Sequence, residues 1–148
     1  EAIQFTMSHD DGKKVDDIKN ADVVLLGVSR TSKTPTSIYL ANRGYKTINI
    51  PLVMDQKIPE KLKSNQACCI VGLVADPERL SDIRRNRVAI MKDQSLKEYT
   101  DLNSIKKEVE DSINLFKKNN WPIIDVTRRS VEETAASILK IIDIKKNK

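Results

Sequence analysis

The sequence predicts an α/β fold in which helices cover both faces of a parallel β-sheet, and three observations support this prediction. Four short runs rich in β-branched residues are almost continuously apolar, as strands buried on both faces are. Segments with helical character fall between and after these runs, and such alternation favours a parallel sheet. The length of 148 residues corresponds to one domain of about 150 residues.

The elements can be placed along the chain from local signals. Strands are expected at residues 21–26, 46–50, 68–74 and 122–126. A helix is expected at residues 36–42 after the first strand, and a short one at residues 59–63 after the second. After the third strand, Asp76 is the expected N-cap of a helix that has Pro77 at its first position.

The last two helices have the clearest signals. From residue 101 to 118, apolar residues recur at steps of three and four, which is one face of an α-helix. Ser130 followed by Glu133 forms a capping box, which predicts the start of the final helix. The polar segment 94–100 has no clear period, and we interpret it as a loop over a site.

Composition and charge exclude several classes of protein. The net charge of +5 is spread over both halves of the chain, which argues against a dedicated basic arm for nucleic acid. No apolar run approaches the ~20 residues that span a bilayer, and no secretory signal is visible. The adjacent Cys68 and Cys69, with a single histidine, fit neither a disulfide framework nor a zinc site of familiar spacing. We therefore expect a cytoplasmic protein without nucleic-acid or membrane partners.

The strongest chemical signal follows the first predicted strand, where the sequence reads Gly27, Val28, Ser29, Arg30, Thr31, Ser32, Lys33, Thr34. The phosphate-binding pattern G-x-x-x-x-G-K-[ST] also lies between a strand and a helix, and here Ser32 replaces its second glycine. Backbone N–H groups and the helix dipole favour an anion at such a junction. In this interpretation Lys33 contacts the terminal phosphates and the Thr34 hydroxyl binds Mg²⁺. The fold is then of the P-loop kinase type.

Two features of this segment bear on that interpretation. If the backbone at Ser32 requires a positive φ, a residue other than glycine is strained there. The alternative is an ordinary strand-to-helix turn that leaves Lys33 on the surface. The position at the carboxyl end of a parallel strand, where open α/β sheets bind ligands, favours phosphate binding. Arg30, inside the segment, is a further candidate anion contact.

Longer blocks of the chain resemble one protein family. These blocks are residues 9–12, 27–41, 49–53, 71–73, 77–80, 83–87 and 124–135. They resemble the bacterial pyruvate, phosphate dikinase regulatory proteins, which are kinase/pyrophosphorylases related to the phosphoenolpyruvate synthase regulatory proteins. In that family residues 9–12 correspond to a segment near the middle of a longer protein. The resemblance therefore implies a missing N-terminal half, a leading segment at residues 1–20 and a nucleotide-binding catalytic domain at residues 21–148.

The resemblance implies a bifunctional enzyme with a protein substrate. As an ADP-dependent serine/threonine kinase, it transfers the β-phosphoryl group of ADP to an active-site threonine of pyruvate, phosphate dikinase. As a phosphate-dependent pyrophosphorylase, it removes that phosphoryl group again. The implied cofactors are ADP, inorganic phosphate and Mg²⁺, and the implied partner is the dikinase. Phosphoenolpyruvate synthase is the alternative target, although Ser32 resembles the dikinase branch, and a homodimer is left open.

Other residues are candidates for the chemistry. His9, Asp10 and Asp11 offer a general base for the threonine proton, with Asp11 preferred, and the alternative is a turn with solvated acids. Asp125, at the end of a strand, is the expected second ligand of Mg²⁺ beside Thr34. Asp76 is another candidate for this role, and the alternative for Asp76 is an N-cap, because an Asp-Pro pair is an efficient helix start.

Arg84 and Arg87 lie three residues apart and share one helix face. They could hold phosphate or stabilise charge in the transition state, and the alternative is a solvated face paired with Glu78 and Asp82. Two other functions compete with the kinase and pyrophosphorylase. One is a small-metabolite kinase, and the other is a nucleotide-sensing module without chemistry.

Overall fold

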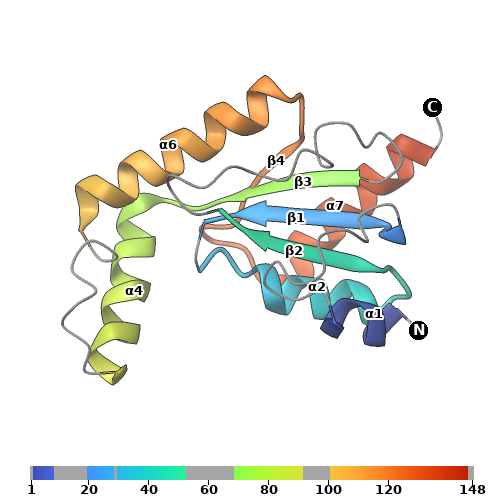
Figure 1. Cartoon of the computed structure of the whole chain (residues 1–148), viewed down its shortest axis with the longest axis horizontal. Helices are drawn as coiled ribbons and strands as arrows, with labels where there is room; N and C mark the ends of the chain where they lie inside the picture. The colour runs from blue at the N-terminus through green and yellow to red at the C-terminus, as the bar shows by residue number, and fades with distance from the viewer. Residues whose placement is uncertain (1, 9–19, 29, 53–68, 92–100, 147–148) are drawn as a thin grey trace.

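The structure, a computed structural model, describes residues 2–8, 20–28, 30–52, 69–91 and 101–146. It confirms the expected architecture, because its four strands are all parallel and form one sheet in the order β2-β1-β3-β4 (Figure 1). The strands are β1 (Val23–Gly27), β2 (Thr47–Pro51), β3 (Cys69–Val74) and β4 (Ile123–Asp125). Most ends of these strands lie within one residue of the expected bounds, because a run of apolar residues marks a strand directly.

Five helices are described, and four of them follow the sequence signals. They are α1 (Ala2–Ser8), α2 (Lys33–Asn42), α4 (Pro77–Met91), α6 (Leu102–Lys118) and α7 (Val131–Lys146). Helix α2 begins three residues before the expected start, since Pro35 falls in its first turn, where a missing N–H costs nothing. None of the described helices is long and apolar enough to cross a membrane. The expected short helix at 59–63 and loop at 94–100 lie outside the described residues.

The unexpected element is α1, which lies in the leading segment. Its Thr6 is buried, and the Thr6 hydroxyl accepts a hydrogen bond from the backbone N–H of Thr47 in β2 at 3.1 Å. The helix has only seven residues and neither an acidic first turn nor a basic last turn, so the sequence offers little to predict it. The proposed division of the chain at residue 20 stays a prediction.

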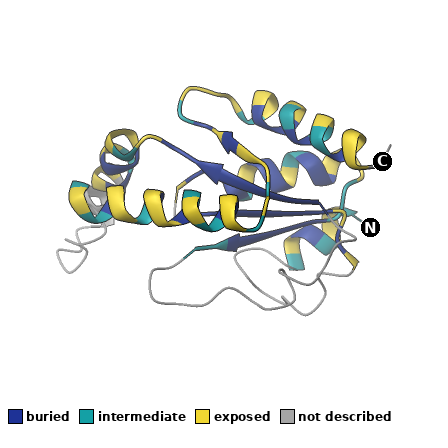
Figure 2. Cartoon of the chain, turned by 90° about the horizontal axis from the view of Figure 1, so that it is seen from above, coloured by how far each residue is buried: buried dark blue, intermediate teal, exposed yellow. Residues whose placement is uncertain are grey.

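The core fills both faces of the sheet. Alternate residues of β1 join different apolar clusters, because successive side chains of a strand point to opposite faces. Val23 and Leu25 belong to the cluster that includes Ile138 of α7, whereas Val24 and Leu26 belong to the one that includes Phe116 of α6. Figure 2 shows the resulting pattern, in which β1, β2 and β3 are buried, the edge strand β4 is partly exposed, and the helices expose their outer faces. This is the predicted three-layer arrangement.

The strand order also locates the place where a ligand is expected. From β1 the chain goes to β2 on one side and then crosses to β3 on the other side of β1. In open α/β sheets the ligand lies at such a switch point, outside the carboxyl ends of the strands. Helix α2 follows the carboxyl end of β1, and α4 follows that of β3. The predicted phosphate loop therefore lies at the switch point.

Candidate phosphate-binding site

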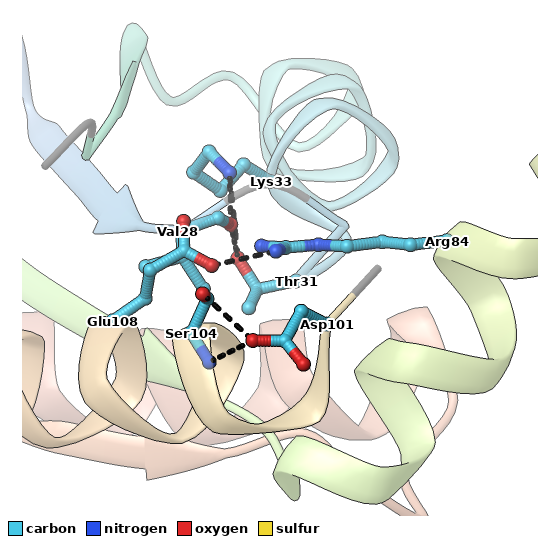
Figure 3. A network of polar contacts seen from close by, with 7 residues as sticks. All are labelled: Val28, Thr31, Lys33, Arg84, Asp101, Ser104 and Glu108. Atoms are coloured by element: carbon cyan, nitrogen blue, oxygen red, sulfur yellow. Dashed lines mark hydrogen bonds and ion pairs between the residues drawn. The ribbon is translucent and has the colours of Figure 1, made fainter. Parts of the chain in front are cut away.

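The loop between β1 and α2 is held together by its own polar groups (Figure 3). The Thr31 hydroxyl donates a hydrogen bond to the carbonyl oxygen of Val28 at 2.9 Å. The Lys33 ammonium donates to the same carbonyl at 2.8 Å and lies 3.4 Å from the Thr31 hydroxyl oxygen. The side chain of Lys33 thus folds back over the loop that precedes it, so that its charge lies at the loop.

Close packing at Gly27 brings this loop against the neighbouring strand. A Cβ atom on Gly27 would lie 2.6 Å from the Thr31 hydroxyl oxygen and 2.9 Å from the carbonyl oxygen of Leu73 in β3. Both distances are too short for real contacts, so only glycine fits without a shift of the backbone. The first glycine of the motif is therefore required by the contact between the loop and β3.

The backbone of the loop enters the left-handed region twice. Arg30 has φ of 72° and Ser32 has φ of 62°, although neither is a glycine. This confirms the prediction that Ser32 is strained if its backbone needs a positive φ. Each such residue costs about 1–2 kcal/mol relative to a right-handed conformation. Strain of this kind persists where the surrounding structure imposes it, as often happens at ligand sites.

Lys33 is buried, with 6% of its surface exposed. The alternative of a turn with a surface lysine is therefore wrong for this residue. Burial of an ammonium group is costly unless polar atoms replace its water, and here the Val28 carbonyl is one such atom. The other residues of the segment divide by exposure, since Val28 and Thr31 are buried whereas Arg30 and Ser32 are exposed. Ser29 lies outside the described residues.

The start of α2 favours an anion more than the start of an ordinary helix does. Ser32 occupies the N-cap position, yet its side chain makes no capping hydrogen bond to the described part of the helix. The first turn contains no acidic residue and begins with the cation Lys33. Because a helix N-terminus is the positive end of the dipole, a cation there is unfavourable unless an anion lies nearby.

A second buried cation, Arg84, points toward Thr31 of the loop in Figure 3. Arg84 of α4 is completely buried, and its Nη1 donates to a carboxylate oxygen of Glu108 in α6 at 2.7 Å. The alternative of a solvated face paired with Glu78 and Asp82 is therefore wrong for Arg84. Its burial could have been anticipated, because Arg84 follows the buried Leu80 by four residues on the same helix face. The side chain of Arg87 lies outside the described part of the chain.

The candidate acids for Mg²⁺ each make local hydrogen bonds. Asp125 accepts from both the backbone N–H and the hydroxyl of Thr127, as a turn residue does. Asp76 accepts from the backbone N–H of Arg79 at 3.2 Å, which confirms it as the N-cap of α4. In sheet order Asp76 follows the strand next to β1, whereas Asp125 ends the strand beyond it. Among the described residues, no three His, Cys, Asp or Glu side chains gather as a metal site.

The remaining candidates, His9, Asp10 and Asp11, lie outside the described residues, so the assignment of a general base stays a prediction. The described loop has the features expected of a phosphate site, and phosphate binding there stays a prediction. It combines a helix N-terminus, a buried ammonium and a loop packed against the switch point of the sheet. These are the features with which proteins neutralise and orient phosphate groups.

Comparison with known proteins agrees with this geometry. Three relatives carry the name "Putative pyruvate, phosphate dikinase regulatory protein". The relative from Pelagibacter ubique (strain HTCC1062) is 62% identical over 148 residues, which are 99% of this chain and 54% of the relative. The relative from Erythrobacter litoralis (strain HTCC2594) is 53% identical over 141 residues, 95% of the chain and 51% of the relative. The one from Bartonella bacilliformis (strain ATCC 35685 / KC583 / Herrer 020/F12,63) is 51% identical over 142 residues, 96% and 50% respectively.

The chain thus spans about half the length of these curated relatives, and the similarity extends over nearly all of it. The model of a protein family described as Kinase/pyrophosphorylase matches residues 1–139. This match includes the whole loop from Gly27 to Thr34, together with Arg84 and Glu108. The chain therefore belongs to the kinase/pyrophosphorylase family.

Proposed function

We propose that this chain is the nucleotide-binding part of a phosphotransferase that regulates pyruvate, phosphate dikinase. The buried Lys33 at the start of α2 carries this proposal, since its ammonium lies at the loop, 2.8 Å from the carbonyl oxygen of Val28. Membership of the kinase/pyrophosphorylase family supports phosphoryl transfer, and the names of the relatives support the dikinase as the protein substrate. The donor is ADP, and the reverse reaction uses inorganic phosphate.

In the forward reaction a threonine hydroxyl oxygen of the dikinase attacks the β-phosphorus of ADP. The bond between this phosphorus and the bridging oxygen breaks, and AMP leaves with the bonding electrons. The threonine proton passes to a base, for which Asp11 is proposed, with His9 and Asp10 beside it in sequence. In the reverse reaction an oxygen of inorganic phosphate attacks the phosphorus of the phosphothreonine and forms the P–O–P bond of pyrophosphate. The bond from this phosphorus to the threonine oxygen breaks, and the leaving oxygen takes a proton from the protonated base to restore the free threonine.

Both reactions need positioning and charge neutralisation rather than a covalent intermediate. Lys33 supplies a positive charge at the loop, and the N-terminus of α2 adds the positive end of its dipole. Thr34 and a strand-end carboxylate, Asp125 or Asp76, have the oxygen donors that Mg²⁺ prefers. A bound Mg²⁺ would neutralise phosphate charge beside Lys33. One loop that serves both directions predicts that ADP and inorganic phosphate compete.

The direct test mixes the chain with purified dikinase, Mg²⁺ and ADP labelled in its β-phosphate. We expect the label on a dikinase threonine and an equal amount of AMP. Lys33→Ala should lower transfer and ADP affinity by about 10- to 100-fold or more, because it removes a charged hydrogen bond to phosphate. Lys106→Ala is the matched control, since Lys106 is an exposed residue of α6 and should have no effect.

The other outcomes separate the alternatives. Tight ADP binding without transfer would favour the nucleotide-sensing module, and transfer to phosphoenolpyruvate synthase instead would change the target. Unaltered ADP binding by Lys33→Ala would contradict the assignment of the loop.

A further inference from the structure

We propose that Arg84 is a second phosphate-contacting cation of the loop site, in addition to Lys33, and that Glu108 is the counter-ion that holds it there. This inference rests on the proposed function, because it assigns a further contact for the phosphate groups of the same nucleotide. The phosphates concerned are those of a nucleoside diphosphate or of pyrophosphate.

The fold places Arg84 next to the loop. Helix α4 begins directly after β3, which is the neighbour of β1 in the sheet, so α2 and α4 start on the two sides of the switch point. Side chains of a helix lean toward its N-terminus, which directs the long side chain of Arg84 back toward this edge of the sheet. Figure 3 shows its guanidinium pointing from α4 toward Thr31 and the carboxylate of Glu108.

The burial of this pair is difficult to explain by stability alone. Arg84 has no exposed surface and the Glu108 side chain has 18% exposed, so both charges have lost most of their water. The attraction within a buried ion pair roughly offsets this loss, and apolar residues of similar volume are often as stable or more so. An apolar pair would therefore join α4 to α6 equally well. A buried charge beside a phosphate loop has a use that an apolar side chain lacks.

The guanidinium group suits this role. It is planar and always charged, and its five N–H groups can contact a carboxylate along one edge and a phosphate along another. Such bidentate contacts to phosphate are strong and directional, whereas an ammonium acts as a point charge. Together with Lys33, Arg84 would add a second positive charge to neutralise the charge of a diphosphate. In some phosphotransferases an arginine near the phosphates stabilises the charge of the transferred group.

The test measures binding of ADP and of inorganic pyrophosphate to the whole chain by calorimetry. Arg84→Gln should weaken binding of both by about 10- to 100-fold, because it removes a charged contact to phosphate. The affinity of Arg84→Lys should lie between those of Arg84→Gln and the unaltered chain, because lysine keeps the charge and lacks the planar guanidinium. Arg85→Gln is the matched control, because Arg85 is the next residue of α4 and is exposed.

A second variant separates binding from folding. Arg84→Gln leaves Glu108 half-buried without its arginine, so this variant can lose stability for that reason alone. The double variant Arg84→Met, Glu108→Leu removes both charges and should remain folded, which circular dichroism and thermal melting would show. If the pair only joins two helices, the double variant binds both ligands as the unaltered chain does. If Arg84 contacts phosphate, the double variant loses as much affinity as Arg84→Gln.

The outcomes distinguish this inference from the proposed function. Binding that depends on Lys33 but is unchanged in Arg84→Gln and in the folded double variant would overturn the inference and leave the proposed function intact. A chain that binds neither ADP nor pyrophosphate would contradict both. An equal loss of affinity in Arg84→Gln and in the double variant, with unchanged affinity in Arg85→Gln, would establish Arg84 as the second cation that contacts phosphate.

Discussion

The helices of this protein begin in two different ways, and the difference supports the proposed phosphate site. Helices α4, α6 and α7 are capped by their own sequence. Asp76 accepts a hydrogen bond from Arg79 N–H in α4, and Asp101 accepts one from Ser104 N–H in α6. Helix α7 begins with the predicted capping box, in which Glu133 N–H donates to the Ser130 hydroxyl and Ser130 N–H to the Glu133 carboxylate.

Helix α2 follows none of these patterns. Its N-cap residue Ser32 is held in a left-handed conformation and makes no capping hydrogen bond with its side chain to the described helix. Its first residue is the buried cation Lys33. The three capped helices satisfy their N-termini with local carboxylate or hydroxyl oxygens, whereas α2 combines a positive dipole end with a positive side chain. This contrast supports the proposal that the start of α2 faces a bound phosphate.

The largest expected effect comes from filling the close contact under the loop. Gly27→Ala should lower the free energy of unfolding by about 1–3 kcal/mol, because its Cβ meets backbone in β3. It should also weaken ADP binding. Gly72→Ala is the matched control, since its Cβ would lie 2.3 Å from the ring of Phe116, away from the loop. Chemical denaturation should show similar losses of stability in both variants, and calorimetry should show a loss of ADP affinity in Gly27→Ala only. Equal ADP affinities of the two variants would contradict the packing argument.

An intermediate effect is expected from the caps. Ser130→Ala should lower the free energy of unfolding by about 1 kcal/mol, because α7 loses the capping hydrogen bond from Glu133 N–H. Ser32→Ala should cost less than about half of that, since the Ser32 side chain makes no cap bond in the described structure. Urea titration measures both losses. A loss at Ser32 as large as that at Ser130 would mean that the two helix starts are stabilised alike.

The smallest effect is a gain. Ser32→Gly should raise the free energy of unfolding by about 0.5–1 kcal/mol, because glycine adopts a positive φ without strain while the unfolded chain gains some entropy. Ala136→Gly at an exposed position of α7 is the control and should lower it by about 1 kcal/mol. Thermal melting of the two variants should therefore show shifts of opposite sign. A destabilised Ser32→Gly would show that the serine side chain contributes to the loop.

Much of the fold was predictable because its signals are local. The apolar runs marked all four strands, and Asp76, Asp101 and the capping box marked the starts of three helices within one residue. The start of α2 was placed too late, since Pro35 resembles a boundary although the first turn of a helix tolerates it. Helix α1 was not predicted, because a seven-residue helix depends on its contact with β2 rather than on its own sequence.

The sequence by itself determined that this protein has a parallel sheet between helices and a strand-to-helix loop that matches the phosphate-binding pattern except for a serine in place of a glycine. These features depend on residues close together in the chain, and the spacing of those residues follows directly from the geometry of a strand, a helix or a loop. Only the tertiary structure decided that Lys33 is buried and that Arg84 pairs with Glu108 rather than with acids of its own helix. That pair joins residues 24 positions apart on two helices, and the free energy of burying a charge depends on what the fold brings around it.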